Sequence, residues 1–341
     1  MIFPDQPAGQ KPAITFCYRG FAANWGTRHV VASILEKAGH YVRQVKDGPV
    51  DLTADSVVWI WGNTNWYPGL YTQLTAMPRA QRPLVVLWHT EPLPPPRAAC
   101  LPWPRLNWWE VAKFILRDSG ATDVYTNYLV LRRWVKKGLP DVLVAATMGR
   151  CGFLSERGIV ADWVPLGYEP SCGHDLGLPR DIDVLFLGAQ DVPRRNRLLR
   201  SLRKNGIRIH AVGSYVNPSC WGEHRTELLN RTKILLNLAR TPGEFPDLRL
   251  ILGMANKALV ISEPIYRPDP FVPGRHFISV SIDEMPEKIR YYLAHDEERA
   301  SIGERAHRLI TQDVTMERSV SRILDLLSVR AQQQALVQSG V

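Results

Sequence analysis

The sequence predicts an α/β protein built from two parallel-sheet domains. Short apolar runs rich in β-branched residues alternate with segments of helical periodicity, and this alternation occurs twice, on either side of a proline-containing stretch at Trp163–Pro170. The chain has 341 residues, enough for two domains of about 150 residues each, and 45% of them are apolar. Because ligands of parallel sheets bind beyond the carboxyl ends of the strands, we expect the functional site in a cleft between the two domains.

The first half of the chain begins with a strand followed by a helix. Ala13–Tyr18 is a short apolar run, and Asn24–Ala38 then places its apolar residues at helical spacing before Gly39 ends the pattern. The near-continuous apolar runs Ser56–Trp61 and Leu84–Trp88 are typical of parallel strands covered on both faces. Other strands are expected at Tyr41–Val45, Asp123–Thr126 and Val142–Ala146, and a loop at Pro92–Pro104.

The second half repeats the pattern. Strands are expected at Asp183–Leu187, Ile207–Val212, Ile234–Ala239, Ala258–Ser262 and Phe277–Val280. Helices are expected at Arg194–Asn205, Thr226–Lys233, Asp247–Asn256, Glu284–Ala294 and Glu317–Leu327. The predicted boundaries are a first domain at 1–164, a linker at 165–180, a second domain at 181–314, a helix at 315–330 that packs back on the first domain, and a frayed tail at 331–341.

Charge and cysteine usage restrict the partners and the compartment. The chain carries 42 Lys and Arg against 33 Asp and Glu, a formal net charge of +9. This charge favours an anionic partner, which could be a nucleotide diphosphate, an anionic membrane face or nucleic acid, although a solvated basic surface explains it equally well. No apolar run is long enough to span a bilayer, and the first residues do not resemble a signal peptide. Since the five cysteines are scattered without a CxxC pair, we expect a cytoplasmic location.

Two strand-end loops of the second half contain residues suited to an anion. Gly188 ends a strand, and its missing Cβ lets a ligand approach the backbone. The next helix begins near Arg194 and Arg195, where free N–H groups and the positive end of the dipole suit a phosphate. These arginines either pair with a diphosphate or belong to a solvated basic helix face.

The loop Thr241–Arg249 is the stronger candidate for an anion site. It is rich in glycine and proline and leads into a helix, with Arg249 in the first or second turn. A bidentate guanidinium there would clamp a diphosphate and stabilise the leaving group as its charge develops. The alternative is an ion pair of Arg249 with Asp247 or Glu244.

An ordered series of segments over Asp181–Leu327 carries a family resemblance. The segments are DIDVLFLGAQDVPRRNRLLRSLRKNGIRIHAVG, LLNRTKILLNLAR, DLRLILGMANKALVISEP, PFVPGRHFISV and IRYYLAHDEERASIGERAHRLI. Because these segments occur in this order and spacing, the chain resembles the CgeB-like family of GT-B glycosyltransferases. The resemblance implies two Rossmann-like domains that face a central cleft, and an enzyme that moves a sugar from a nucleotide-sugar donor to an acceptor hydroxyl.

The resemblance also implies where the substrates bind. The second domain would hold the nucleotide sugar, the first would hold a glycan, lipid-linked or small-molecule acceptor, and no metal or other cofactor is expected. The implied donor-side residues are Gly188, Arg195, Asn230, Lys233, Asn237, Arg249 and Glu263.

Two positions depart from the family pattern. Members usually carry Glu in R-x-F-E, where it commonly holds the nucleotide ribose, but Leu252 stands at that position here. Further along the chain, Lys257 stands where members of the family usually have glycine. The departure suggests that Glu263 takes over the ribose, or that the protein is a GT-B-like scaffold that binds without catalysing transfer.

Catalytic and acceptor residues are expected in the first half. His89 and Glu91 follow the strand Leu84–Trp88, and either could deprotonate an acceptor hydroxyl if the reaction inverts the anomeric centre. A retaining reaction would need no such base, and a buried strand-end histidine is an equally good reading of His89. Aromatic faces pack on sugar C–H surfaces, so acceptor contacts are expected from strand-end residues. These residues are Arg19, Asn24, Trp25 and Trp66.

Other candidate sites are weaker. Asp181-Ile182-Asp183 matches the DxD of metal-dependent transferases, but it precedes a strand instead of ending one, so we expect no metal there. There is no Walker loop and no G-x-G-x-x-G. A third function, glycosylation of a modified DNA base, is suggested by the basic first half, but Lys/Arg blocks interleaved with aromatics are lacking.

Overall fold

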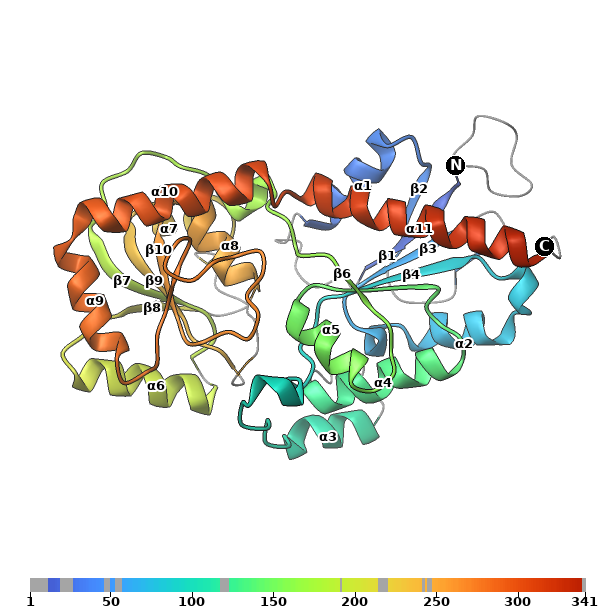
Figure 1. The fold of residues 1–341 in the computed structure, drawn as a ribbon, viewed down its shortest axis with the longest axis horizontal. Coiled ribbons are helices and arrows are strands. Elements are labelled where there is room, and N and C mark those ends of the chain that lie inside the picture. The colour runs from blue at the N-terminus through green and yellow to red at the C-terminus, as the bar shows by residue number, and fades with distance from the viewer. Residues whose placement is uncertain are drawn as a thin grey trace. The chain divides into compact units, whose positions relative to one another are not determined.

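The chain forms two compact units, each with its own sheet (Figure 1). Unit 1 comprises Met1–Pro165 and Ser319–Val341, and unit 2 comprises Leu166–Arg318. The computed structural model describes residues 12–18, 27–45, 50–52, 57–116, 123–190, 192–213, 220–240, 243 and 247–338. Each unit is an α/β structure, as the alternation of strand and helix patterns predicted.

Unit 1 is built on a six-stranded parallel sheet with the order β2-β1-β3-β4-β5-β6. The strands are β1 (Ile14–Cys17), β2 (Val42–Val45), β3 (Val57–Trp61), β4 (Leu84–His89), β5 (Val142–Ala145) and β6 (Asp162–Trp163). The helices are α1 (Thr27–Lys37), α2 (Pro68–Ala76), α3 (Trp108–Ile115), α4 (Val124–Lys136), α5 (Met148–Ser155) and α11 (Met316–Gln338). Strands β3 and β4 are almost wholly buried, because helices cover both faces of the sheet.

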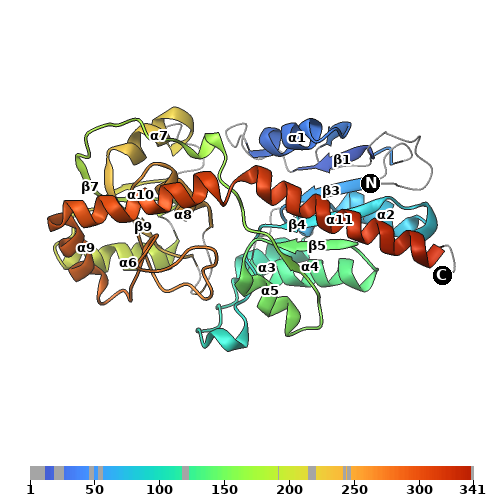
Figure 2. The same ribbon diagram turned by 45° about the horizontal axis from the view of Figure 1, so that its top comes forward.

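Helix α11 starts in unit 2 and then runs along unit 1, as Figures 1 and 2 show. Ser319 donates its hydroxyl hydrogen to the carbonyl of Pro165 at 2.8 Å, and Gln334 donates to Asp141 at 3.1 Å. Val320, Ile323, Leu327 and Ala331, which recur at helical spacing, are buried. The last helix therefore supplies part of the core of the unit formed by the first half of the chain.

Unit 2 contains a five-stranded parallel sheet with the order β11-β10-β9-β7-β8. The strands are β7 (Ile182–Leu187), β8 (His210–Val212), β9 (Thr232–Asn237), β10 (Leu259–Ser262) and β11 (Ile278–Ser279). The helices are α6 (Pro193–Lys204), α7 (Gly222–Asn230), α8 (Asp247–Ala255), α9 (Met285–Ala294) and α10 (Asp296–Gln312). Apolar residues of α7 and α8 pack in one cluster against the sheet and those of α6 and α9 in another, and α10 contributes residues to both.

Several predicted elements differ from the structure. The expected strand Asp123–Thr126 is the start of α4, because the Asp123 carboxylate accepts the Tyr125 N–H at 2.8 Å and caps a helix. The expected helix Thr226–Lys233 is displaced toward the N-terminus, since Thr232 and Lys233 belong to β9. The tail expected to fray from residue 331 is helical to Gln338. Short helices α2, α3, α5 and the long α10 were not predicted.

No helix among the described ranges combines the length and apolar character needed to cross a membrane.

Candidate functional site

The strand order of unit 2 reverses at β7, which has β8 on one side and β9 on the other. In parallel sheets the carboxyl edge at such a reversal is where ligands bind. Gly188 follows β7 directly at this edge, with a φ of +152° and its N–H bonded to the carbonyl of Val212 at 2.8 Å. A Cβ on Gly188 would lie 3.1 Å from the Arg249 Nη2 atom. The bare backbone of Gly188 and the Arg249 guanidinium therefore lie face to face.

Arg249 is held at this edge by contacts with two strand ends. Its Nε donates to the carbonyl of Leu187 at 2.9 Å, and its Nη1 donates to the side-chain oxygen of Asn237 at 2.7 Å. Asn237 ends β9 and donates its amide hydrogen to the Ser262 hydroxyl at 2.9 Å, so its orientation is set in turn by β10. The sequence-predicted residues Gly188, Asn237 and Arg249 are thus brought together.

A second arginine reaches the same edge from the start of α6. The Nε of Arg195 donates to the carbonyl of Leu238 at 3.0 Å, and the Nη1 of Arg249 lies 3.4 Å from that same oxygen. The guanidinium carbons of Arg195 and Arg249 lie 5.9 Å and 5.5 Å from the centroid of the Phe186 ring. Two like charges therefore converge on one carbonyl and one aromatic face, an arrangement that an anion would stabilise.

Arg194 and Glu263 form the third part of this edge. Nη1 of Arg194 donates to the Glu263 carboxylate at 3.0 Å, and Nη2 donates to its other oxygen, so the pair is bidentate. The same carboxylate accepts the N–H of Ala239 at 2.9 Å, and Arg194 also donates to the Ala239 carbonyl at 2.9 Å. Glu263 is buried and its charge is already balanced by Arg194. Arg194 is thus engaged by this carboxylate, whereas Arg195 and Arg249 contact the backbone and Asn237 at the same edge.

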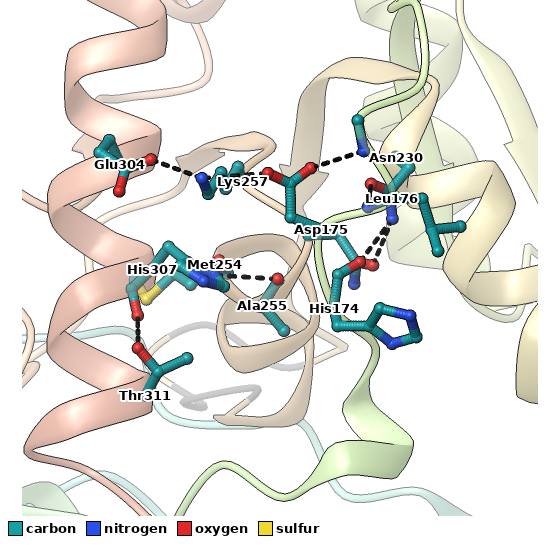
Figure 3. Close-up of polar contacts among 12 residues, drawn as sticks. His174, Asp175, Leu176, Asn230, Met254, Ala255, Lys257, Glu304, His307 and Thr311 are labelled. Carbon is teal, nitrogen blue, oxygen red and sulfur yellow. Dashed lines mark hydrogen bonds and ion pairs between the residues drawn. The ribbon is translucent and has the colours of Figure 1, made fainter.

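Two predicted donor residues lie at the opposite edge of the sheet. Asn230 ends α7 just before β9, and its side chain binds the backbone of His174, Leu176 and Thr226 and the amide of Asn256 at 2.7–2.9 Å (Figure 3). Lys233 is the second residue of β9 and pairs with Asp183 at 2.6 Å. Both therefore stabilise the amino edge of the sheet and do not join the residues around Gly188.

The two departures from the family pattern are explained by packing. Leu252 of α8 is buried in an apolar cluster with Leu250, Met254 and Phe277, where a carboxylate would be unpaired. Lys257 has a φ of +55°, the left-handed conformation that glycine adopts at little cost, and it ends the α8 turn.

Lys257 compensates for its backbone conformation with two ion pairs. Its ammonium group lies 3.0 Å from the carboxylate of Asp175 and 2.7 Å from that of Glu304, on α10 (Figure 3). Hydrogen bonds to these two carboxylates raise the pKa of Lys257, and the Lys257 hydrogen bond lowers the pKa of Glu304. The lysine thus ties the turn after α8 to α10.

The catalytic candidates of unit 1 differ in their environments. His89 ends β4 and is fully buried, and neither of its ring nitrogens has a hydrogen-bond partner in the described ranges. Burial, and next the positive charge of Arg150, lower the pKa of His89 to about 3. So weak a base is poorly suited to deprotonating a hydroxyl. Glu91 is only partly buried in the turn after β4.

The remaining acceptor candidates are partly outside the described residues. Arg19, Asn24 and Trp25 fall outside them. Trp66 packs against the core of unit 1, and a Cβ on Gly62 would lie 2.2 Å from its ring. The structure therefore gives Trp66 a packing role.

The aspartates of the DxD sequence are paired with cations at the amino edge of unit 2. Asp181 accepts hydrogen bonds from Arg231 at 2.9 Å and 2.5 Å, and Asp183 pairs with Lys233. Across the described ranges, no group of three or more His, Cys, Asp or Glu side chains is arranged to hold a metal ion. Among the described residues at the carboxyl edge around Gly188, Arg194, Arg195 and Arg249 lie with the single carboxylate of Glu263.

Part of the chain is similar to a known protein family. Residues 194–325 match the family of glycosyl transferase-like proteins. No curated protein matches the chain. The CgeB-like branch remains a prediction from the sequence.

Solved structures of similar fold cover nearly the whole chain. TarM of S. aureus has a TM-score of 0.56 at 14% identity over 87% of this chain, which spans 57% of TarM. HepE of Anabaena, in complex with UDP and glucose, has a TM-score of 0.62 at 9% identity, over 94% of this chain and 100% of HepE. Sucrose-phosphate synthase of Thermosynechococcus elongatus has a TM-score of 0.61 at 12% identity, over 93% and 98% of the two chains. The chain has the GT-B fold, and its residues 194–325 are similar to glycosyl transferase-like proteins.

Proposed function

We propose that this chain transfers a sugar from a nucleoside-diphosphate donor to an acceptor hydroxyl without a metal ion. The observation that carries the proposal is the convergence of Arg195 and Arg249 on the Leu238 carbonyl beside the bare backbone of Gly188. Parallel-sheet domains bind ligands at this position, and residues 194–325, which match the transferase family, include both arginines. The UDP in the complexes of TarM and HepE makes uridine diphosphate the first candidate.

In the proposed reaction, unit 2 stabilises the leaving group. The bond between the sugar C1 and the diphosphate oxygen breaks, and negative charge develops on the diphosphate. Arg195, Arg249 and the N–H groups at the start of α6 supply positive charge where a metal ion would otherwise be needed. The acceptor oxygen forms the new bond to C1.

The proton of the acceptor hydroxyl must leave as this bond forms. For an inverting reaction we assign that proton to Glu91, because burial and the pKa of about 3 make His89 a poor base. Replacement of Glu91 by Gln is expected to lower turnover without weakening nucleotide binding. We place the reaction in the cytoplasm, in keeping with the five free cysteines.

Nucleotide binding tests the proposal directly. The melting temperature and affinity are measured with UDP, GDP, CDP, ADP and dTDP for the wild type, Arg249→Gln and Arg197→Gln. Arg197 lies exposed on α6, so its variant is the matched control. Loss of a charge-assisted hydrogen bond costs about 1.5–3 kcal/mol, so Arg249→Gln is expected to weaken binding at least about tenfold. Absence of binding by all five nucleotides, or equal affinities of the two variants, would contradict the proposal.

A second candidate function is binding without transfer. It is favoured by the buried Leu252 at the usual glutamate position and by the engagement of Glu263 with Arg194. Donor hydrolysis distinguishes the two functions, because a scaffold would bind the nucleotide sugar and release it intact. Turnover that is lost in Arg249→Gln and kept in Arg197→Gln would exclude the scaffold.

A further inference from the structure

Helix α3 of unit 1 turns its apolar side to the solvent. Four large apolar side chains are exposed by 70–80%: Trp108, Trp109, Ile115 and Leu116. Together with the exposed Ala112, they recur at the spacing of one helix face. No residue of α3 is buried. Trp103 and Leu106, in the segment before the helix, are exposed as well.

The other side of α3 is fixed by polar and aromatic contacts. Glu110 and Lys113 pair at 2.9 Å, and the Arg133 guanidinium of α4 lies 5.3 Å from the centroid of the Phe114 ring. Asn107 caps the helix by accepting the Trp109 N–H at 3.2 Å. The helix is therefore anchored against α4, beside which Figure 1 shows it. Its large apolar side chains are left exposed to the solvent.

The surroundings of this apolar face are strongly basic. Residues 97–137 contain eight Lys and Arg and three Asp and Glu, a net charge of +5. The exposed basic residues in the described part of this segment include Arg97, Arg105, Arg132, Lys136 and Lys137. An occupant must therefore offer an apolar layer and negative charge together, which is the composition of an anionic lipid surface.

We propose that α3 binds the chain to an anionic membrane surface. Its eight residues span about 12 Å, far less than the roughly 30 Å hydrocarbon core of a bilayer, so the helix lies in the interface and does not cross it. Tryptophan suits this position, because its ring is apolar and its N–H reaches the polar headgroups. The basic residues on either side bind the lipid phosphates.

Vesicle flotation of the full chain tests this proposal. The wild type is expected to float with phosphatidylcholine vesicles containing about one third phosphatidylglycerol, to float much less with phosphatidylcholine alone, and to be released by salt. Trp108→Ser with Trp109→Ser is expected to lower the partition coefficient at least about tenfold. Because these side chains are exposed, the variant should fold, and Ile115→Ser with Leu116→Ser is a second test of the same face.

The matched control removes exposed apolar side chains elsewhere in unit 1. Tyr41 and Val160 are 70% and 88% exposed and lie outside α3, so Tyr41→Ser with Val160→Ser should float like the wild type. Absence of flotation of the wild type, or equal loss in the α3 and control variants, would overturn the proposal. So would self-association of the wild type that both α3 variants abolish without a change in flotation. Nucleotide binding by unit 2 is scored separately, so either proposal can fail without the other.

Discussion

Replacement of His89 by Leu is expected to change how the stability of unit 1 depends on pH. The imidazole is fully buried at the end of β4, where burial and the charge of Arg150 lower its pKa from 6.5 to about 3. The folded unit therefore binds this proton much more weakly than the unfolded chain. The contribution of neutral His89 to the free energy of unfolding is fully present above the pKa of the histidine in the unfolded chain. It is lost as the pH falls toward the pKa of His89 in the folded unit.

The size of the effect follows from the two pKa values. Between about pH 7.5 and about pH 5, an unfolded histidine with a pKa of 6.5 takes up nearly one proton, whereas a folded one with a pKa of about 3 stays neutral. Integration over this range gives a loss of about 2 kcal/mol in the free energy of unfolding. His89→Leu should remove that contribution and so flatten the pH dependence by the same amount.

Urea unfolding followed by tryptophan fluorescence reports mainly on unit 1. Ten of the 11 tryptophans precede Pro165, and none lies in the part of α11 that belongs to unit 1. The free energy of unfolding is determined at both pH values for the wild type, His89→Leu and His174→Gln. His174 is exposed in unit 2, so its variant should keep the wild-type dependence. If His89→Leu and the wild type lose the same free energy on acidification, His89 is not held neutral by its surroundings.

Substitutions at three further positions probe unit 2. Gly188→Ala places a Cβ 3.1 Å from Arg249, so calorimetric nucleotide affinity should fall at least about tenfold, and unchanged affinity would exclude close ligand approach at Gly188. Leu252→Glu should cost about 3 kcal/mol or more in thermal unfolding, because the carboxylate enters an apolar cluster; a stable variant with tighter nucleotide binding would instead mark the position as a ribose site. Lys257→Ala and Lys257→Gly lose the same ion pairs, but the glycine variant should be more stable by about 1 kcal/mol at a φ of +55°; equal melting temperatures would refute this.

The local pattern of the sequence determined the class of fold. The runs at Val57–Trp61 and Leu84–His89 are apolar throughout because helices cover both faces of the parallel sheet, so their strand character is visible in the chain itself. Helix α9 was predicted from the apolar residues on one of its faces, and α6 was predicted as a basic helix that ends before Gly206. The start of α4 was misread, because Asp123 acts as a cap through a hydrogen bond that periodicity does not reveal.

The sequence also identified part of the candidate site. Gly188, Arg195 and Arg249 were singled out because glycine at a strand end and arginine near a helix start suit an anion, and these residues meet at the carboxyl edge of unit 2. Asn230 and Lys233 were implied by the family resemblance, yet they lie at the amino edge of the sheet. Opposite ends of one strand are only a few residues apart in the chain, so spacing alone could not separate the two edges.

Only the tertiary structure decided which charges are already engaged. Arg194 and Glu263 are far apart in the chain, and their bidentate pairing depends on α6 and β10 meeting at the end of the sheet. The low pKa of His89 likewise arises from burial and from Arg150 on a neighbouring element. The tryptophans of α3 could be counted in the sequence, but that they face the solvent follows from the packing of the helix against α4. The local pattern of apolar and polar residues determines which helices and strands form, because it depends on residues close together in the chain. Contacts between distant segments determine which side chains are already paired.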